Sequence, residues 1–167
     1  AGIGILVDEG VLEWEKPIKN YLPDLKLWSS TATEMITLKD ILTHTTGLCN
    51  DDRYVAEFKD LTSREEIVKN LQHVKDFVEI RKEFRYSNIM YMLLAYLTEK
   101  VIGKRWEDFM AERVFFPLGM KKTNFFPAKS RKMANFAYSY CQSEDGGLSP
   151  YNGDDFQLFA PAGGIFT

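Results

Sequence analysis

The serines of this chain are the first candidates for chemistry, because an activated serine hydroxyl can attack a carbonyl carbon. Such a hydroxyl is a poor nucleophile unless a neighbouring base removes its proton. None of the serines has lysine three positions later, and none lies in a Gly-x-Ser-x-Gly segment. We therefore predict no nucleophilic serine among these 167 residues.

The triplet Tyr86-Ser87-Asn88 contains a phenol and an amide two residues apart. A tyrosine can act as a general base when cations lower its pKa, and an asparagine side chain offers both a donor and an acceptor. With 8 Tyr in the chain, one such triplet carries little weight alone. Tyr86 can equally be a half-buried aromatic with a partnered hydroxyl, and Asn88 can be the N-cap of the following helix.

Two acidic pairs, Asp51-Asp52 and Asp154-Asp155, could supply an acid and a base. Both lie in polar stretches, so we predict solvated turns instead. The glycine pairs Gly146-Gly147 and Gly163-Gly164 are isolated and do not form a phosphate-binding loop.

The composition gives little indication of a metal site or a disulfide bond. The chain has 2 His and 2 Cys, and no Cys-x-x-Cys or Cys/His cluster, so a zinc site is not expected. Cys49 and Cys141 show no disulfide-rich spacing and are predicted to be free thiols. We predict no metal and no cofactor.

The overall composition is that of an ordinary globular domain, with 45% hydrophobic and 27% charged residues. The formal net charge of −3 argues against a nucleic acid partner, because such proteins usually carry a basic excess. No apolar run is long enough to predict a membrane span.

Helical patterns run through the first two thirds of the chain. A helix ending at Gly10 covers residues 3–10, and Asn88–Ile102 is apolar on nearly every side, which predicts a buried helix ended by Gly103. The other predicted helices are Pro17–Tyr21, Leu38–Thr43 with Thr37 as N-cap, a helix opened by a Ser63/Glu66 capping box, and Arg105–Phe115. From Thr123 onward we predict loops with short strands.

Three stretches together resemble the serine beta-lactamase and penicillin-binding-protein-like family, in its class C beta-lactamase and esterase branch. They are Ile36–Leu48 with its Thr-His-x-x-Gly-Leu run, Phe84–Asn88, and Pro161–Ile165. The resemblance covers about residues 3–167. It implies a mainly α chain: the helical lobe of the α+β serine beta-lactamase/DD-peptidase fold, with a loop-rich C-terminal third.

The resemblance also implies roles for single residues. Tyr86 takes the place of the general base, and Asn88 the place of the amide that binds the catalytic lysine and the substrate. Gly163 and Gly164 are expected to be substrate-binding residues that let the backbone pass close to the wall of the site without a side-chain clash. Ser87 is a spacer, and His44 is a hydrogen-bonded structural residue rather than a catalytic one.

Two family motifs are missing from these residues. The resemblance places Ser-x-x-Lys before Ala1 and Lys/His-x-Gly beyond Thr167. Residues 1–10 are then the tail of the nucleophile helix, 11–122 the helical core, and 123–167 the return toward the sheet. The Pro-Gly that usually precedes the tyrosine motif is replaced within Ile80–Glu83, so the approach loop is expected to differ.

The resulting hypothesis is part of a serine hydrolase that forms an acyl-enzyme with a beta-lactam, peptide or ester. Its partner in the complete enzyme is a small-molecule or peptide substrate, and these residues alone are predicted to be inactive. The alternative is a non-catalytic helical binding module derived from the same family. A chance match of an unrelated helical domain is the third possibility.

Overall fold

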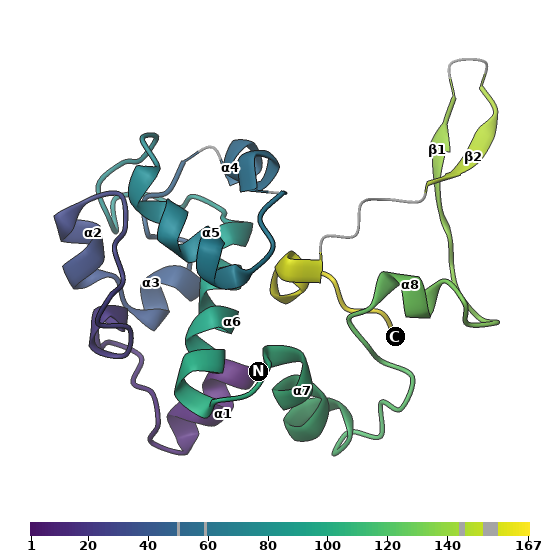
Figure 1. Cartoon of the computed structure of the whole chain (residues 1–167), viewed down its shortest axis with the longest axis horizontal. Helices are drawn as coiled ribbons and strands as arrows, with labels where there is room; N and C mark the ends of the chain where they lie inside the picture. The colour runs from purple at the N-terminus through teal and green to yellow at the C-terminus, as the bar shows by residue number, and fades with distance from the viewer. Residues whose placement is uncertain (50, 59, 144–145, 152–156) are drawn as a thin grey trace.

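Helix α6 (Asn88–Ile102) forms the centre of the fold, and α3, α4, α5, α7 and η4 all pack against it. The computed structural model describes residues 1–49, 51–58, 60–143, 146–151 and 157–167 (Figure 1). The buried side chains of α6 point in every direction around its axis, which confirms the predicted buried helix. They are Ile89, Met90, Met92, Leu93, Leu94, Ala95, Leu97 and Thr98. Gly103 ends the helix with a φ of 70°, as predicted.

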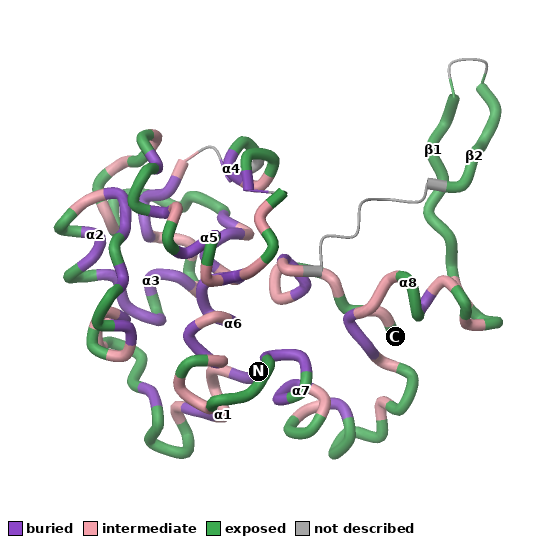
Figure 2. The backbone as a smooth tube through the Cα atoms, in the orientation of Figure 1, coloured by how far each residue is buried: buried purple, intermediate pink, exposed green. Residues whose placement is uncertain are grey.

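The elements before α6 are short, and α3, α4 and α5 among them pack against it (Figures 1 and 2). Their bounds are α1 (Gly2–Asp8), η1 (Ile18–Asn20), α2 (Ser30–Met35), α3 (Leu38–Leu42), α4 (Asp51–Phe58), α5 (Arg64–Asn70) and η2 (Leu71–His73). Those predicted as helices are confirmed, with η1 a single 3₁₀ turn. Helices α2 and α4 were not predicted, because their sequences are polar and short.

Side-chain caps start several of these helices. Thr37 and Asp40 form a reciprocal capping box at α3. Ser63 accepts the Glu66 N–H at α5, as predicted, but the Glu66 carboxylate binds the backbone and hydroxyl of Thr62. At α6 the prediction is wrong by one residue, because Ser87 and not Asn88 is the N-cap.

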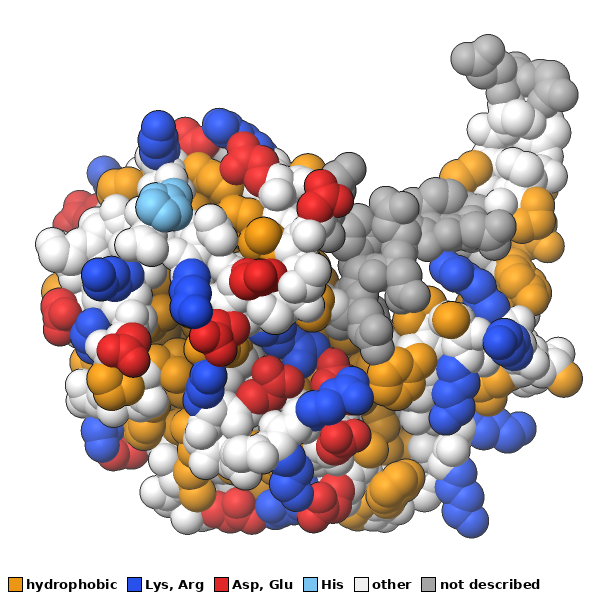
Figure 3. Space-filling view, viewed as in Figure 1, with side chains coloured by type: hydrophobic (Ala, Val, Ile, Leu, Met, Phe, Trp, Pro, Cys, Tyr) orange, Lys and Arg blue, Asp and Glu red, His pale blue; other side chains and the backbone are white. Residues whose placement is uncertain are grey.

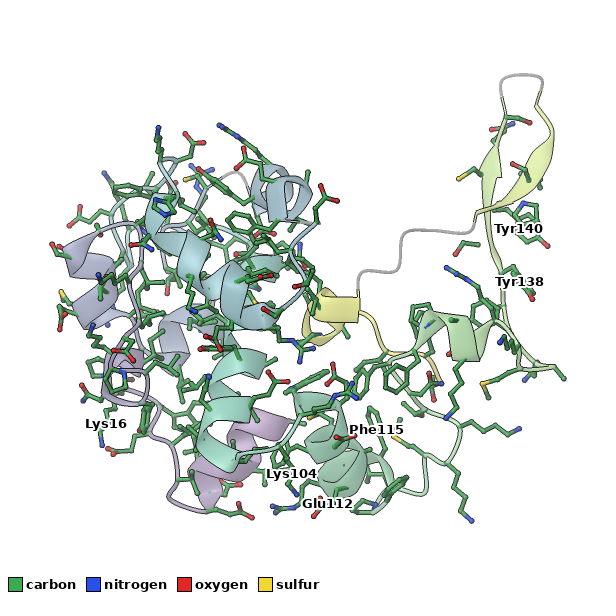
Figure 4. All side chains as sticks on the ribbon, in the orientation of Figure 1. Lys16, Lys104, Glu112, Phe115, Tyr138 and Tyr140 are labelled. Carbon is green, nitrogen blue, oxygen red and sulfur yellow. The ribbon has the colours of Figure 1, made fainter. Side chains whose placement is uncertain are left out.

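The chain after α6 is less regular. Its elements are α7 (Trp106–Met110), the π-helical turn η3 (Ala111–Phe115), α8 (Pro127–Ser130), β1 (Ser139–Gln142), β2 (Leu148–Tyr151) and η4 (Gln157–Ala162). Helix α7 and η3 together cover the predicted helix, and Lys104 bonds to Glu112 alongside them (Figure 4). The predicted short strands are present: β1 and β2 pair antiparallel, with Ser139 opposite Tyr151.

The β1–β2 hairpin projects away from the helices (Figure 1). The described residues of β1 are exposed, as are the neighbouring Tyr138 and Leu148 (Figures 2 and 4). Segment η4 returns from this side to pack along α6. The C-terminal third therefore extends out from the helical body and comes back to it.

A buried ion-pair cluster joins four elements. The Arg64 guanidinium on α5 donates to Glu99 on α6 and to Glu107 on α7, at 2.6 Å each, and to the Leu158 carbonyl of η4 at 3.1 Å. Arg64 and Glu107 are buried. Burial would raise the pKa of Glu107, but the hydrogen bond and charge of Arg64 outweigh it, so the pKa lies below its ordinary value.

Elsewhere the surface charges are mixed. On the face shown in Figure 3, acidic and basic side chains are interspersed over the helices. No helix among the described residues is long and apolar enough to cross a membrane. Cys49 and Cys141 are free thiols, as predicted.

Candidate active site

Two loops bring the candidate site together. Residues 44–49 lie beside residues 76–85, joined by backbone hydrogen bonds such as Val78 N–H to the Gly47 carbonyl (2.8 Å) and Arg85 N–H to the His44 carbonyl (2.7 Å). Gly47 has a φ of 84°, and a Cβ there would lie 2.3 Å from the Val78 oxygen. Only glycine fits this contact, so the glycine of the Thr-His-x-x-Gly-Leu run holds the second loop in place.

Tyr86 and Asn88 lie together at the N-terminus of α6. The Tyr86 hydroxyl donates to Asn88 Oδ1 at 3.1 Å. Tyr86 is 56% exposed, more than the half-buried alternative implied, although its hydroxyl does have a partner. A phenol and an amide are thus paired at the surface. Only the phenolate form of a tyrosine can take up a proton, and a phenolate cannot donate, so this hydrogen bond belongs to the protonated phenol.

Asp51, the first residue of α4, is the main partner of this turn. Its carboxylate accepts from Ser87 Oγ (2.7 Å), Asn88 N (2.7 Å), Asn88 Nδ2 (3.0 Å) and Ile89 N (3.2 Å). Asp51 is buried. The prediction of a solvated turn is therefore wrong for Asp51, because packing of α4 against α6 buries the carboxylate against the orphan donors of a helix start. The side chain of Asp52 and the pair Asp154-Asp155 lie outside the described residues.

Ser87 is fully buried and its hydroxyl is used twice. The hydroxyl donates to Asp51 and accepts the Met90 N–H at 3.2 Å. A hydroxyl held in this way is a helix cap and not a nucleophile, in agreement with its predicted role as a spacer.

His44 supports the same turn from the other side. Its Nδ1 accepts the Ser87 N–H at 3.1 Å, which places the proton of the neutral ring on Nε2. The ring stacks on Tyr91 and contacts Tyr86 and Phe84, with centroids 4.6–5.4 Å apart. His44 is hydrogen-bonded, as predicted. Burial lowers its pKa below the ordinary 6.5, although the Asp51 charge opposes this.

This geometry predicts a pH dependence of stability. Just below pH 6.5 the unfolded chain binds more protons at residue 44 than the folded chain, so stability falls as the pH decreases through that window. We expect His44→Asn to lose this slope, because the Asn oxygen can accept the Ser87 N–H without titrating and Asn tolerates the φ of 58°. Urea unfolding of both proteins between pH 7.5 and about pH 5 measures the difference. Equal slopes would remove His44 as the cause.

The approach loop differs from the family pattern at Arg81. This residue adopts a φ of 64°, a conformation that favours glycine. Its guanidinium makes two 2.8 Å bonds to the buried Asp40 carboxylate. Burial would raise the pKa of Asp40, but the bonds from Arg81 lower it overall. An ion pair to the α3 capping box thus offsets the backbone strain of the arginine that stands in this loop.

The predicted pair Gly163-Gly164 follows η4. Both N–H groups donate to the Ala160 carbonyl, and a Cβ on Gly164 would lie 2.9 Å from Ala160 Cα. Glycine at 164 is required by this close approach to its own segment. Among the described residues, no hydrogen bond joins the pair to Tyr86 or Asn88.

Asp51 was missed as a site residue from the sequence. It lies 37 positions before Asn88, and an acidic pair in a polar stretch is the ordinary pattern of a turn. The only signal was the charge requirement at the start of a buried helix. A preference for negative charge at a helix start does not indicate which carboxylate of the chain will supply it.

Comparison with known proteins identifies the family of this chain. A family model described as Beta-lactamase matches residues 1–167, and the chain therefore belongs to the Beta-lactamase family. It is 30% identical over 130 residues to an unguisins hydrolase of Aspergillus campestris, covering 74% of this chain and 24% of that protein. It is 27% identical over 149 residues to penicillin-binding protein 4* of Bacillus subtilis, covering 83% of this chain and 31% of that protein.

The fold matches solved structures of the same kind. An octameric penicillin-binding protein homologue from Pyrococcus abyssi superposes with a TM-score of 0.76 at 26% identity, covering 98% of this chain and 38% of that one. The mainly helical chain thus has the fold of one part of these proteins. It spans between a quarter and two fifths of the length of the relatives named here.

Proposed function

We propose that this chain is the helical lobe of a serine hydrolase of the Beta-lactamase family, and that it contributes Tyr86 and Asn88 to the active site. The observation that carries the proposal is the exposed Tyr86–Asn88 pair at the start of a buried helix. Its membership of the family supports the same reading. In this proposal residues 1–10, 11–122 and 123–167 are the helix tail, the core and the return toward a sheet.

The proposed chemistry needs a serine and a lysine from outside these residues. The serine oxygen attacks the carbonyl carbon of a beta-lactam, peptide or ester while Tyr86, which must be in its phenolate form beside the cationic lysine, takes the hydroxyl proton and becomes a neutral phenol. The bond to the leaving nitrogen or oxygen then breaks, and that atom receives the proton. Water hydrolyses the resulting acyl ester and restores the serine.

Asn88 and the glycine pair have supporting parts in this scheme. The Asn88 side chain can bind the lysine through its oxygen and a substrate amide through its remaining N–H. Gly163 and Gly164 are proposed to bind substrate by letting the backbone pass close to the wall of the site without a side-chain clash. A hydrolase and a penicillin-binding protein among the relatives support a hydrolytic reaction and a substrate of the beta-lactam kind.

Covalent labelling tests the proposal. The product of the complete reading frame should gain one equivalent of a fluorophosphonate or a penicillin, measured by intact mass, at a serine of a Ser-x-x-Lys segment. The 167-residue chain should gain none, because none of its serines has the required neighbours. Denatured samples of both control for non-specific labelling.

Two results would contradict the proposal. A complete product that contains no such serine and takes up no label would favour the non-catalytic binding module. Stoichiometric labelling of any serine within residues 1–167 would show that the nucleophile is a residue of this chain.

A further inference from the structure

The Asp51 carboxylate collects hydrogen bonds from three consecutive residues, Ser87, Asn88 and Ile89. An ionised carboxylate can only accept. Both of its oxygens are used, and the residue is buried. The turn that carries the candidate site is therefore tied to α4, an element from a different part of the chain.

The hydrogen bond from the Asn88 side chain to Asp51 is not part of the capping of α6. Two backbone N–H groups of α6 bind Asp51, as expected for an anion at a helix N-terminus. Ser87 already supplies the side-chain cap through the Met90 N–H. The bond from Asn88 Nδ2 to Asp51 at 3.0 Å satisfies a side-chain amide and adds nothing to the capping.

That bond determines which way the Asn88 amide faces. Because Asp51 only accepts, the NH₂ group must point toward it. The Asn88 oxygen then points toward the Tyr86 hydroxyl, which donates to it at 3.1 Å. With the amide turned over, an oxygen would face a carboxylate and the NH₂ group would face the phenol.

We infer that Asp51 is a positioning residue that fixes the orientation of the Asn88 amide, so that the oxygen of Asn88 faces Tyr86. The inference rests on the proposed function for its catalytic consequence. The two hydrogen bonds that link Asp51 to Asn88 and Asn88 to Tyr86 do not depend on the proposed function. Asp51 acts through Asn88 and does not touch substrate.

The test compares Asp51→Asn with the wild type in the product of the complete reading frame. An asparagine keeps the shape of Asp51, but one accepting carboxylate oxygen is replaced by an NH₂ group that donates. The Asn88 amide therefore loses its preferred orientation. We expect kcat to fall about 10- to 100-fold with KM within about threefold, because misplaced groups act mainly on the chemical step. The Asn88 side-chain NH₂ signals should shift in ¹⁵N NMR spectra.

A matched control separates positioning from stability. Ser29→Ala removes the N-cap of α2, which lies outside the candidate site, and should lower the melting temperature while leaving kcat unchanged. Asp51→Asn must reduce kcat at temperatures where both variants are fully folded. If kcat in both variants falls only in proportion to the fraction of folded protein, the inference is overturned.

A measurement on the wild type covers the case in which Asp51→Asn does not fold. A scalar coupling across the hydrogen bond from Asn88 Nδ2 to the Asp51 carboxyl carbon should be detectable, and its absence would overturn the inference. Unchanged kcat and Asn88 signals in Asp51→Asn would do the same. If Tyr86→Phe and Asn88→Ala leave labelling unaffected, the proposed function fails, and the coupling then decides the positioning role alone.

Discussion

Replacing Tyr86, the proposed general base, with phenylalanine should lower the acylation rate of the proposed serine hydrolase by about a thousandfold, within the range that general bases contribute. The substitution removes only the hydroxyl that donates to Asn88. Because Tyr86 is exposed, little packing is lost and stability should change by less than about 1 kcal/mol. Stopped-flow acylation by a chromogenic cephalosporin or ester measures the rate.

Tyr91→Phe is the matched control for this prediction. Tyr91 stacks on the same histidine as Tyr86, but its hydroxyl donates to the Leu42 carbonyl inside the fold. Its removal should cost about 1 kcal/mol of stability and leave acylation within a few fold. Equal acylation rates in Tyr86→Phe and wild type would exclude Tyr86 as the base.

The second large effect concerns stability. Arg64→Met should lower the free energy of unfolding by about 3–5 kcal/mol, because the part-buried Glu99 loses its cation and the buried Glu107 keeps only the exposed Arg105 at 3.5 Å. This is a large part of the total stability of an ordinary domain, about 5–15 kcal/mol. Urea unfolding at pH 7 measures the loss.

An exposed ion pair and the pH dependence of stability provide the controls for this prediction. Lys39→Met removes an exposed ion pair with Glu15 and should cost at most about 1 kcal/mol. Because Arg64 lowers the pKa of Glu107 in the folded wild type, the difference between wild type and Arg64→Met should shrink as the pH falls below 4.5. Replacing Glu99 and Glu107 by leucine in Arg64→Met should recover much of the loss. A change of less than 1 kcal/mol at pH 7 in Arg64→Met would contradict the prediction.

Helix α6 and the adjacency of its first residues were predictable from the sequence. A run of apolar residues without a polar face predicts a buried helix, and Gly103 supplies the left-handed residue that ends it. Tyr86 and Asn88 are only two positions apart, so their contact is local.

Other features were not predictable, since they depend on residues far apart in the chain. Asp51 belongs to a polar segment whose sequence favours a solvated turn, and it is buried only because α4 packs on α6. Arg81 has a glycine-like conformation, and the strain is offset by its ion pair with Asp40, 41 residues earlier. Arg64 is buried and binds two carboxylates and a backbone carbonyl from three other segments.

The sequence by itself determined the central helix, its end, and the pairing of a phenol with an amide at its start. Those features follow from helical periodicity, backbone conformation and short spacing, which act over a few residues. Only the tertiary structure decided that Asp51 and His44 hold this turn from two sides. The physical reason is that a buried polar group must find its partner wherever packing brings one, and packing joins segments that no local pattern connects.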